Sequence, residues 1–232
     1  MTPLRAEVCP LCGAPGPFKA VVDVRKRRQR VCEHCRLVFV EDSFLPSPEA
    51  ERERYAKHQY GLDDAGYVTF LRQAVDPVLP RLNPQMRGLD YGCGHSPTLC
   101  LLLEKAGLHC ENYDPFFFPA RPAGPFDFLF ATEVVEHFFH PAAEWERMAA
   151  LLRPGGLLVA MTAPWEDLES FRTWGYASDE THVCFYHRRT LEWISAHFGF
   201  EELDRRNPRV SILRKKGGIA SDHGLRPGFI VA

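Results

Sequence analysis

The segment Leu89-Asp90-Tyr91-Gly92-Cys93-Gly94 constrains the fold more than any other part of the chain, because it joins a short apolar strand to a helix. Glycines at such a turn let the backbone pass close to a ligand that a Cβ atom would block. Asp114 lies twenty residues beyond Gly94, where a second predicted strand ends. A carboxylate there can accept hydrogen bonds from both hydroxyls of a ribose. The pattern predicts an α/β fold whose ligand lies at the carboxyl ends of parallel strands.

Strands and helices alternate along most of the chain. We expect strands at 87–91, 109–113, 126–131 and 157–162, helices at 98–106, 141–152 and 190–198, and a closing antiparallel strand pair at 200–206 and 209–214. This order predicts a Rossmann-like, doubly wound sheet. Only eleven residues, 115–125, separate Asp114 from the next strand, which is too few for a helix and a strand of ordinary length. We therefore expect the sheet to be one strand short, or to hold a degenerate strand.

The glycine turn leaves two ligand classes open. A nicotinamide dinucleotide is possible on the strand-turn-helix geometry alone. Its fingerprint, however, is G-x-G-x-x-G, and position 97 is proline in this chain. The missing third glycine favours a ligand that has a ribose but no phosphates.

Four segments resemble class I S-adenosylmethionine-dependent methyltransferases, and the likeness extends over residues 50–214. These segments are Asp90-Tyr91-Gly92-Cys93-Gly94, Asp114, the run from Phe126 to His137, and Leu151-Leu152-Arg153-Pro154-Gly155-Gly156-Leu157-Leu158. The resemblance implies that the glycines face the methionine part of the cofactor, that Asp114 binds its ribose, and that Thr132 and Glu133 lie beside it.

The resemblance supplies most of the predicted cofactor contacts. They are Asp90, Tyr91, Gly92, Cys93, Gly94, Asp114, Pro115, Phe116, Thr132 and Glu133, together with Tyr55, His58 and Tyr67 on the helices that precede the first motif. Family members usually hold the adenine after a strand that this chain lacks. Pro115, Phe116 and Phe117 either stack on the adenine instead or fill the core. The helical residues equally fit a surface helix with aromatic anchors.

Two cysteine pairs near the N-terminus predict a zinc site. Cys9 and Cys12 are followed, after nineteen residues, by Cys32 and Cys35. Two C-x-x-C knuckles at this spacing place four thiolates around one zinc ion, which makes the site closed and structural. Redox pairs or plain buried cysteines are the alternatives, and His34 is an alternative ligand. A hairpin is expected between the pairs, at 18–24 and 29–31.

Three residues are candidates for catalysis. His182 is the first choice for a general base and Tyr186 for an acceptor contact, because a segment similar to T-H-x-x-F-Y occurs in some bacterial methyltransferases of this class. His137 is the second choice for the base. Either histidine could instead serve only as a hydrogen-bonded structural residue.

The sequence predicts four parts and leaves the acceptor open. We expect a zinc ribbon at 1–45, a helical linker or cap at 46–86, an S-adenosylmethionine-binding domain at 87–214 and a flexible tail at 215–232. The net charge of −2 argues against a wide nucleic-acid surface, whereas the basic stretch 25–30 favours a local one or is a solvated turn. The favoured function is methylation of a small molecule. RNA is the alternative, since an N-terminal zinc module resembles those of ribosomal RNA guanine methyltransferases.

Three further expectations concern other functions and the setting of the protein. The chain could be a zinc-containing binding protein without activity, or it could methylate a sugar, since some sugar methyltransferases begin with cysteine pairs. We expect a cytoplasmic protein without a signal peptide or membrane span, because its longest apolar runs are short. The sequence does not indicate an oligomeric state.

Overall fold

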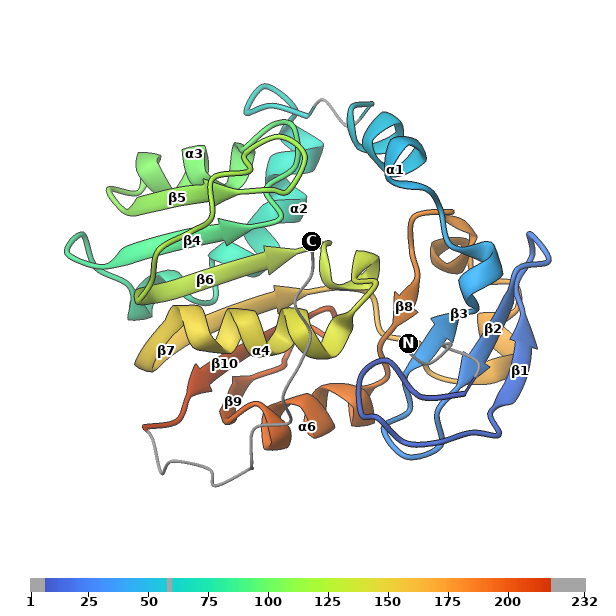
Figure 1. Ribbon diagram of the computed structural model, residues 1–232. Coiled ribbons are helices and arrows are strands. Elements are labelled where there is room, and N and C mark those ends of the chain that lie inside the picture. The colour runs from blue at the N-terminus through green and yellow to red at the C-terminus, as the bar shows by residue number, and fades with distance from the viewer. Residues whose placement is uncertain (1–6, 58–59, 218–232) are drawn as a thin grey trace.

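The computed structural model describes residues 7–57 and 60–217, and in this part the strands form two sheets (Figure 1). The larger sheet has the order β5-β4-β6-β7-β10-β9, and the smaller has the order β1-β2-β3-β8. The strands of the larger sheet are β4 (Arg87–Tyr91), β5 (His109–Tyr113), β6 (Phe126–Thr132), β7 (Leu152–Met161), β9 (Phe200–Asp204) and β10 (Val210–Lys215). The first four in sheet order are parallel and the last two antiparallel, as expected for the predicted fold class.

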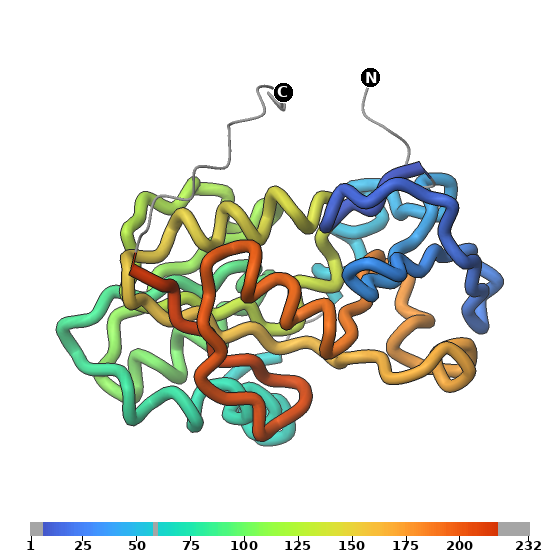
Figure 2. Tube along the Cα trace, turned by 90° about the horizontal axis from the view of Figure 1, so that it is seen from below, coloured from blue at the N-terminus to red at the C-terminus, as the bar shows by residue number. Residues whose placement is uncertain are grey.

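Helices cover both faces of the larger sheet. Side chains along β6 alternate between the faces, so that Phe128 and Phe130 pack with α2 (Ala65–Val75) and α3 (Thr98–Lys105). Leu129 and Ala131 pack on the other side, with α4 (Pro141–Leu151) and α6 (Arg188–His197). Figure 2 shows α2 and α4 on opposite sides of the sheet. This arrangement leaves the carboxyl ends of the parallel strands clear of the main helices.

The prediction that one strand is missing is confirmed. The connection 115–125, every residue of which is described, holds neither a helix nor a strand, and only an isolated bridge joins Asp114 to Phe118. One strand begins earlier than predicted. The strand expected at 157–162 begins at Leu152, because Gly155, at φ +81°, lets the chain bulge between Phe126 and Phe128 of β6 without leaving the sheet.

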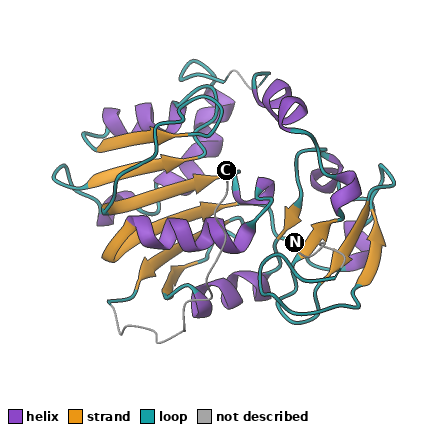
Figure 3. Ribbon diagram, in the orientation of Figure 1, coloured by secondary structure: helices purple, strands orange, loops and turns teal. Residues whose placement is uncertain are grey.

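The smaller sheet joins the N-terminal module to a segment that follows β7. It consists of β1 (Lys19–Val22), β2 (Arg28–Val31), β3 (Val38–Val40) and β8 (Cys184–Phe185). The hairpin predicted between the cysteine pairs is present as β1 and β2, and β3 pairs with β8 through Val38 and Phe39. The N-terminal module is therefore completed by residues that follow it by about 150 positions, as Figure 3 shows at the right of the molecule.

The remaining helices are short and connect these layers. They are α1 (Pro48–Tyr55), α5 (Leu168–Phe171) and the 3₁₀ helices Asp42–Phe44, Leu79–Arg81, Val135–His137 and Gly175–Ser178. The start of α1 is capped, because the Ser47 hydroxyl accepts a hydrogen bond from the Ala50 amide and proline occupies the first helical position.

Three predictions, on the tail, on His58 and on membrane spans, can be compared only with the residues that the structure describes. Lys215 of the predicted tail belongs to β10, and its ammonium group donates to the last carbonyls of α4. Residues 218–232 and His58 lie outside the described residues. Within the part that the structure describes, no helix is both long and apolar enough to cross a membrane.

Candidate functional site

A cavity of about 420 Å³ lies at the carboxyl ends of β4, β5 and β6. Its floor contains much of the predicted cofactor set, namely Tyr91, Gly92, Cys93, Gly94, Asp114 and Pro115. Phe116, Thr132 and Glu133 complete its sides, and Tyr55 and Tyr67 reach it from α1 and α2. Ligand cavities in proteins span roughly 300–1,000 Å³, so the space suits a small ligand.

The two glycines of the turn have different roles. Gly92 has φ +83°, and a Cβ atom there would lie 2.1 Å from Cγ2 of Val134, so no larger residue fits. Gly94 has φ +66°, and a Cβ atom there would meet nothing within 4 Å. Glycine at position 94 therefore suits the positive φ angle of the backbone. It also leaves open space beside the turn, as expected where a ligand approaches the chain.

Asp114 is buried at the cavity wall, with 6% of its surface exposed. One carboxylate oxygen accepts a hydrogen bond from the Gly94 amide at 3.1 Å. The other accepts from the amides of Phe116 and Phe117, at 2.9 and 3.1 Å. Since a carboxylate offers about four acceptor positions, these three bonds leave little spare capacity, and they tie the glycine turn to the next loop. Sequence reasoning assigned only a ligand-binding role to this residue.

Asp90 is placed differently from the rest of the predicted set. It lies within β4 and is buried, and it is not among the described residues that line the cavity. Burial, with a smaller contribution from the Asp114 carboxylate, raises the pKa of Asp90 to about 7. This buried position suits a role in supporting the Gly92–Gly94 turn and not a role in contacting a ligand.

Aromatic side chains cover the cavity from the side of α1 and α2. The Tyr55 hydroxyl donates to Glu51 at 2.8 Å, and its ring packs against Phe116, with 5.8 Å between ring centroids. Burial raises the pKa of Glu51 to about 7. Tyr60 and Tyr67 pack against each other at 5.1 Å. Phe116 thus lines the cavity, whereas Phe117 is not among its described lining residues and packs on His95.

Two carboxylates lie close together beyond the end of β6. Glu133, at φ +51°, binds the Arg209 guanidinium through both oxygens at 3.0 Å. Glu136 is fully buried, and it accepts a short hydrogen bond from the Tyr176 hydroxyl, which also contacts Glu133 at 3.2 Å. Burial raises the pKa of both carboxyls to about 7, and their mutual repulsion adds to the shift of Glu133.

Two of the three catalytic candidates lie side by side. The rings of His137 and His182 are 4.8 Å apart between centroids, although 45 positions separate them in the sequence. Only His137 of the pair is among the described residues that line the cavity. Burial lowers the pKa of His137, and it lowers that of His182 to about 3. Both rings are therefore neutral near pH 7.

Tyr186 lies in the core, and this position argues against the predicted acceptor contact. Its side chain is fully buried, its hydroxyl donates to the Val135 carbonyl at 2.9 Å, and Trp145 packs against it. The hydroxyl is thus used to fix the 3₁₀ helix that carries His137.

Sequence reasoning missed part of the cavity wall. Glu144 and Arg147, one turn apart on α4, form an ion pair at 3.2 Å and line the cavity. Glu144 also accepts a short hydrogen bond from the Tyr91 hydroxyl. Their spacing could have indicated a polar helix face but not the strand end that the helix meets.

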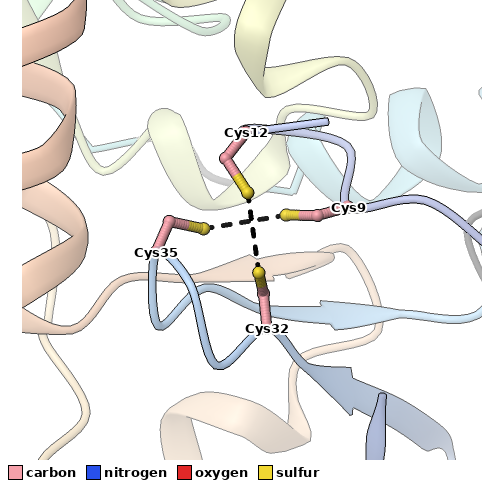
Figure 4. A group of neighbouring side chains, drawn as sticks. All are labelled: Cys9, Cys12, Cys32 and Cys35. Atoms are coloured by element: carbon pink, nitrogen blue, oxygen red, sulfur yellow. Dashed lines mark hydrogen bonds between the residues drawn. The ribbon is translucent and has the colours of Figure 1, made fainter. Parts of the chain in front are cut away.

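The four N-terminal cysteines converge on one point (Figure 4). The sulfurs of Cys9 and Cys35 are 3.7 Å apart, and those of Cys12 and Cys32 are 3.5 Å apart. Sulfurs arranged tetrahedrally at about 2.3 Å from a zinc ion lie about 3.8 Å from one another. The arrangement therefore fits the predicted ligand set, and His34 instead packs near Trp193.

The basic stretch is used within the molecule. Arg27 is 6% exposed, pairs with buried Asp23 at 2.9 Å, and donates to the carbonyls of Ala177, Glu180 and His182. Arg25 pairs with the Glu180 side chain. Arg27 thus fastens the hairpin to the loop that carries His182.

Comparisons with known proteins agree with this geometry. A family model described as a methyltransferase domain matches residues 59–204. A chain from a Haloferax volcanii complex of a methyltransferase activator with a methyltransferase shares the fold, at TM-score 0.50 and 12% identity, over 72% of this chain and 98% of that one. A Burkholderia thailandensis 1,6-didemethyltoxoflavin-N1-methyltransferase with bound S-adenosylhomocysteine is 16% identical, at TM-score 0.47, over 86% of this chain and all of that one. No curated protein matches the chain.

The match to the family model covers more than half of the chain, and it spans the glycine turn, Asp114 and the carboxylates beyond β6. The order of the strands in the larger sheet agrees with it. The chain belongs to the methyltransferase-domain family and is a class I S-adenosylmethionine-dependent methyltransferase.

Proposed function

We propose that the protein transfers a methyl group from S-adenosylmethionine to a small molecule, and that both bind in the cavity described above. The observation that carries the proposal is the cavity itself, in which the Gly92–Gly94 turn and Asp114 meet a wall of aromatic rings. These features lie at the carboxyl ends of parallel strands, where open α/β sheets bind ligands.

The residues present fit the cofactor. Open space lies beside Gly94, and the buried Thr132 hydroxyl at the cavity wall has no hydrogen-bond partner among the described residues. Asp114, with its remaining acceptor capacity, would hold the ribose, and Pro115 and Phe116 would contact the adenine. When bound, the cofactor supplies a methyl group on a positively charged sulfur.

The aromatic cover would orient the reactants and exclude water. Tyr55, Tyr67 and Phe70 line the cavity on the side of α1 and α2. Aromatic faces attract a cationic centre by about 0.5–2 kcal/mol each when it is desolvated. An in-line methyl transfer needs the acceptor held close to the sulfonium, and a closed apolar wall favours this arrangement.

The acceptor is proposed to lie on the side of Glu133 and His137. Both residues line the cavity at the end of β6, where the Tyr55 ring packs on His137 with 5.2 Å between ring centroids. The ring of His137 is neutral and is fixed through Nδ1, which contacts the Thr181 carbonyl at 2.9 Å. His182 packs behind His137 and would hold it in place.

A small molecule is favoured over RNA as the acceptor. The argument for RNA rested on the N-terminal zinc module and on the basic stretch 25–30, and in the structure Arg25 and Arg27 of that stretch pair with Glu180 and Asp23. Cations already paired within the protein release few counterions from a nucleic acid. The intact turn and Asp114 also argue against a binding protein that has lost its activity.

We also propose that the cysteine cluster binds one structural zinc ion. The sulfur-to-sulfur distances of 3.5 and 3.7 Å support this assignment. Cys9, Cys32 and Cys35 are each nearly fully buried, so four thiolates would close the coordination sphere. The ion would join the hairpin to the core that faces α6.

Two measurements test the proposed activity. Isothermal titration calorimetry with S-adenosylhomocysteine should show one site per chain, and absence of heat from a folded sample would contradict the cofactor assignment. Tritium from methyl-labelled S-adenosylmethionine should then pass into the small-molecule fraction of a cell extract. Label recovered only in RNA would overturn the choice of acceptor and leave the cofactor assignment intact.

A further inference from the structure

Glu136, His137 and His182 form a second group of possible metal ligands. Each offers one ligand atom, and these atoms all lie within 4.8 Å of one another. Glu136 and His137 come from the 3₁₀ helix after β6, and His182 comes from the loop after Gly175–Ser178. Backbone bonding holds the two segments together, since the Val183 amide donates to the Glu136 carbonyl at 2.8 Å.

Both histidines present a free lone pair. Nδ1 of His137 lies 2.9 Å from the Thr181 carbonyl, and Nδ1 of His182 lies 2.8 Å from the Tyr176 carbonyl. A carbonyl oxygen can only accept, so Nδ1 carries the hydrogen in each ring and Nε2 keeps its lone pair. Metal-binding histidines are commonly fixed in this way, with one nitrogen donating to a backbone carbonyl and the other facing the ion.

Glu136 has an unused oxygen in a fully buried position. Its Oε1 atom accepts from the Tyr176 hydroxyl, whereas Oε2 has no hydrogen-bond partner among the described residues. The Thr162 hydroxyl also interacts with the Glu136 carboxyl and pairs with the Tyr176 oxygen at 3.1 Å. A buried carboxylate oxygen without a partner costs folding free energy unless a cation or donor satisfies it.

The local charges also point to a cation. Glu133 and Glu136 share a single nearby guanidinium, that of Arg209, and both of its hydrogen bonds go to Glu133. The Glu136 carboxyl is fully buried, and no cation pairs with it among the described residues. A divalent ion would supply the compensating charge.

We propose that Glu136, His137 and His182 bind a divalent transition-metal cation at the wall of the cavity. Two imidazoles and one carboxylate suit first-row ions such as Fe²⁺, Co²⁺ or Zn²⁺ and leave coordination positions open. Ligand atoms about 2.1 Å from an ion lie roughly 3–4 Å apart, so the three side chains need to close by less than about 2 Å.

The same lone pair could instead make His137 a general base, and its neighbours decide between the roles. A base that passes its proton on needs a partner able to accept it near neutral pH. His182, which packs on His137, has its Nδ1 hydrogen held by the Tyr176 carbonyl and is not among the described residues that line the cavity. Because His137 lines the cavity, an acceptor oxygen or nitrogen could complete the coordination, a step that rests on the proposed function.

Cobalt binding to the full-length chain loaded with one equivalent of zinc, which the four thiolates take up, tests the proposal. Zinc holds thiolate sites more tightly than Co²⁺ does, so added Co²⁺ should leave the cysteine cluster unchanged. We expect one equivalent to bind, with visible absorption but without the charge-transfer band of thiolate ligation. Glu136→Gln and His182→Ala should weaken binding at least about tenfold, whereas His109→Ala, an exposed histidine at the far end of the sheet, should not.

The outcomes separate the cation site from the methyltransferase activity, since no cofactor is present in the titration. Circular dichroism checks that each variant is folded. If the wild-type chain takes up no added Co²⁺, the proposal is wrong whatever the variants do. It is also wrong if folded Glu136→Gln and His182→Ala both bind Co²⁺ like wild type, or if the added ion shows thiolate absorption.

Discussion

The cysteine cluster and the Glu136–His137–His182 group both gather ligand atoms at a point, but they do so in opposite ways. The four cysteines come from two short knuckles on one hairpin, and their sulfurs lie at zinc-like distances. The second group draws on residues 45 positions apart and borders a cavity. The comparison teaches that a closed structural site can be encoded by local spacing, whereas an open site at a cavity depends on how distant segments meet.

Among the tests of this comparison, substitution of one of the four cysteines should change stability the most. We expect Cys32→Ser to lose the zinc ion and to destabilise the N-terminal sheet by more than about 5 kcal/mol, because metal binding and folding are coupled in such modules. Metal analysis and thermal unfolding measure the two effects. Cys93→Ser, which changes a cysteine outside the cluster, should keep its zinc. A stable, metal-free Cys32→Ser protein would show that the cluster is not a structural metal site.

Arg27→Ala tests whether the N-terminal module depends on the distant loop. The substitution leaves the Asp23 carboxylate buried without its cation and removes the bonds to Ala177, Glu180 and His182. Breaking a buried pair in this way costs about 3–5 kcal/mol, which urea unfolding can measure.

Arg28→Ala is the matched control. Arg28 is 58% exposed and pairs with Glu41 at 3.3 Å, so its loss should cost less than about 1 kcal/mol. Equal effects of the two substitutions would mean that the hairpin is not fastened to the loop through Arg27.

Asp114→Asn tests the cavity directly. We expect the affinity for S-adenosylhomocysteine to fall by about 2–3 kcal/mol, or roughly 30- to 150-fold, because charge-assisted hydrogen bonds are lost. Calorimetry of the wild-type and variant proteins measures the change, and Asp76→Asn, at an exposed helix end, is the control. Unchanged affinity would restrict Asp114 to its bonds with Gly94, Phe116 and Phe117.

The smallest effect concerns the pH dependence of stability at Glu51. Burial raises its folded-state pKa to about 7, above the ordinary value of 4.5, so the folded state binds more protons than the unfolded state between these values. Stability from this group is therefore present at pH 5 and is lost as the pH rises through 7, by about 2 kcal/mol.

Glu51→Gln should flatten the profile by that amount in urea unfolding measured from pH 5 to pH 7. The Tyr55 hydroxyl can still donate to the amide oxygen, so the variant should remain folded. A profile that keeps its full slope would assign the dependence to Glu133 and Glu136 instead.

Much of the fold followed from local patterns. Alternating apolar segments predicted the parallel strands, and the short connection 115–125 predicted the missing one. The glycine turn was placed correctly because a strand-to-helix turn at φ above zero leaves few alternatives to glycine. Most of the predicted cofactor contacts line the cavity because the carboxyl ends of parallel strands meet at one edge of the sheet.

The predictions about the loop after β7 and about the basic stretch 25–30 were less accurate. Tyr186 looked like an acceptor contact, but its hydroxyl serves the Val135 carbonyl in the core. Arg27 looked like part of a surface charge run, but it donates to the carbonyls of Ala177, Glu180 and His182. Both roles depend on partners about 50 to 150 positions away, and no local period or spacing encodes such a partner.

The sequence by itself determined the order of the strands along the chain, the glycine turn, the acid that follows it and the two cysteine pairs, because each is a property of neighbouring residues. Only the tertiary structure decided that β8 completes the N-terminal sheet, that His137 borders the cavity while His182 stands behind it, and that Glu136 keeps an unpaired buried oxygen. Those facts arise from packing between segments far apart in the chain, where burial and hydrogen-bond partners are set by the whole fold.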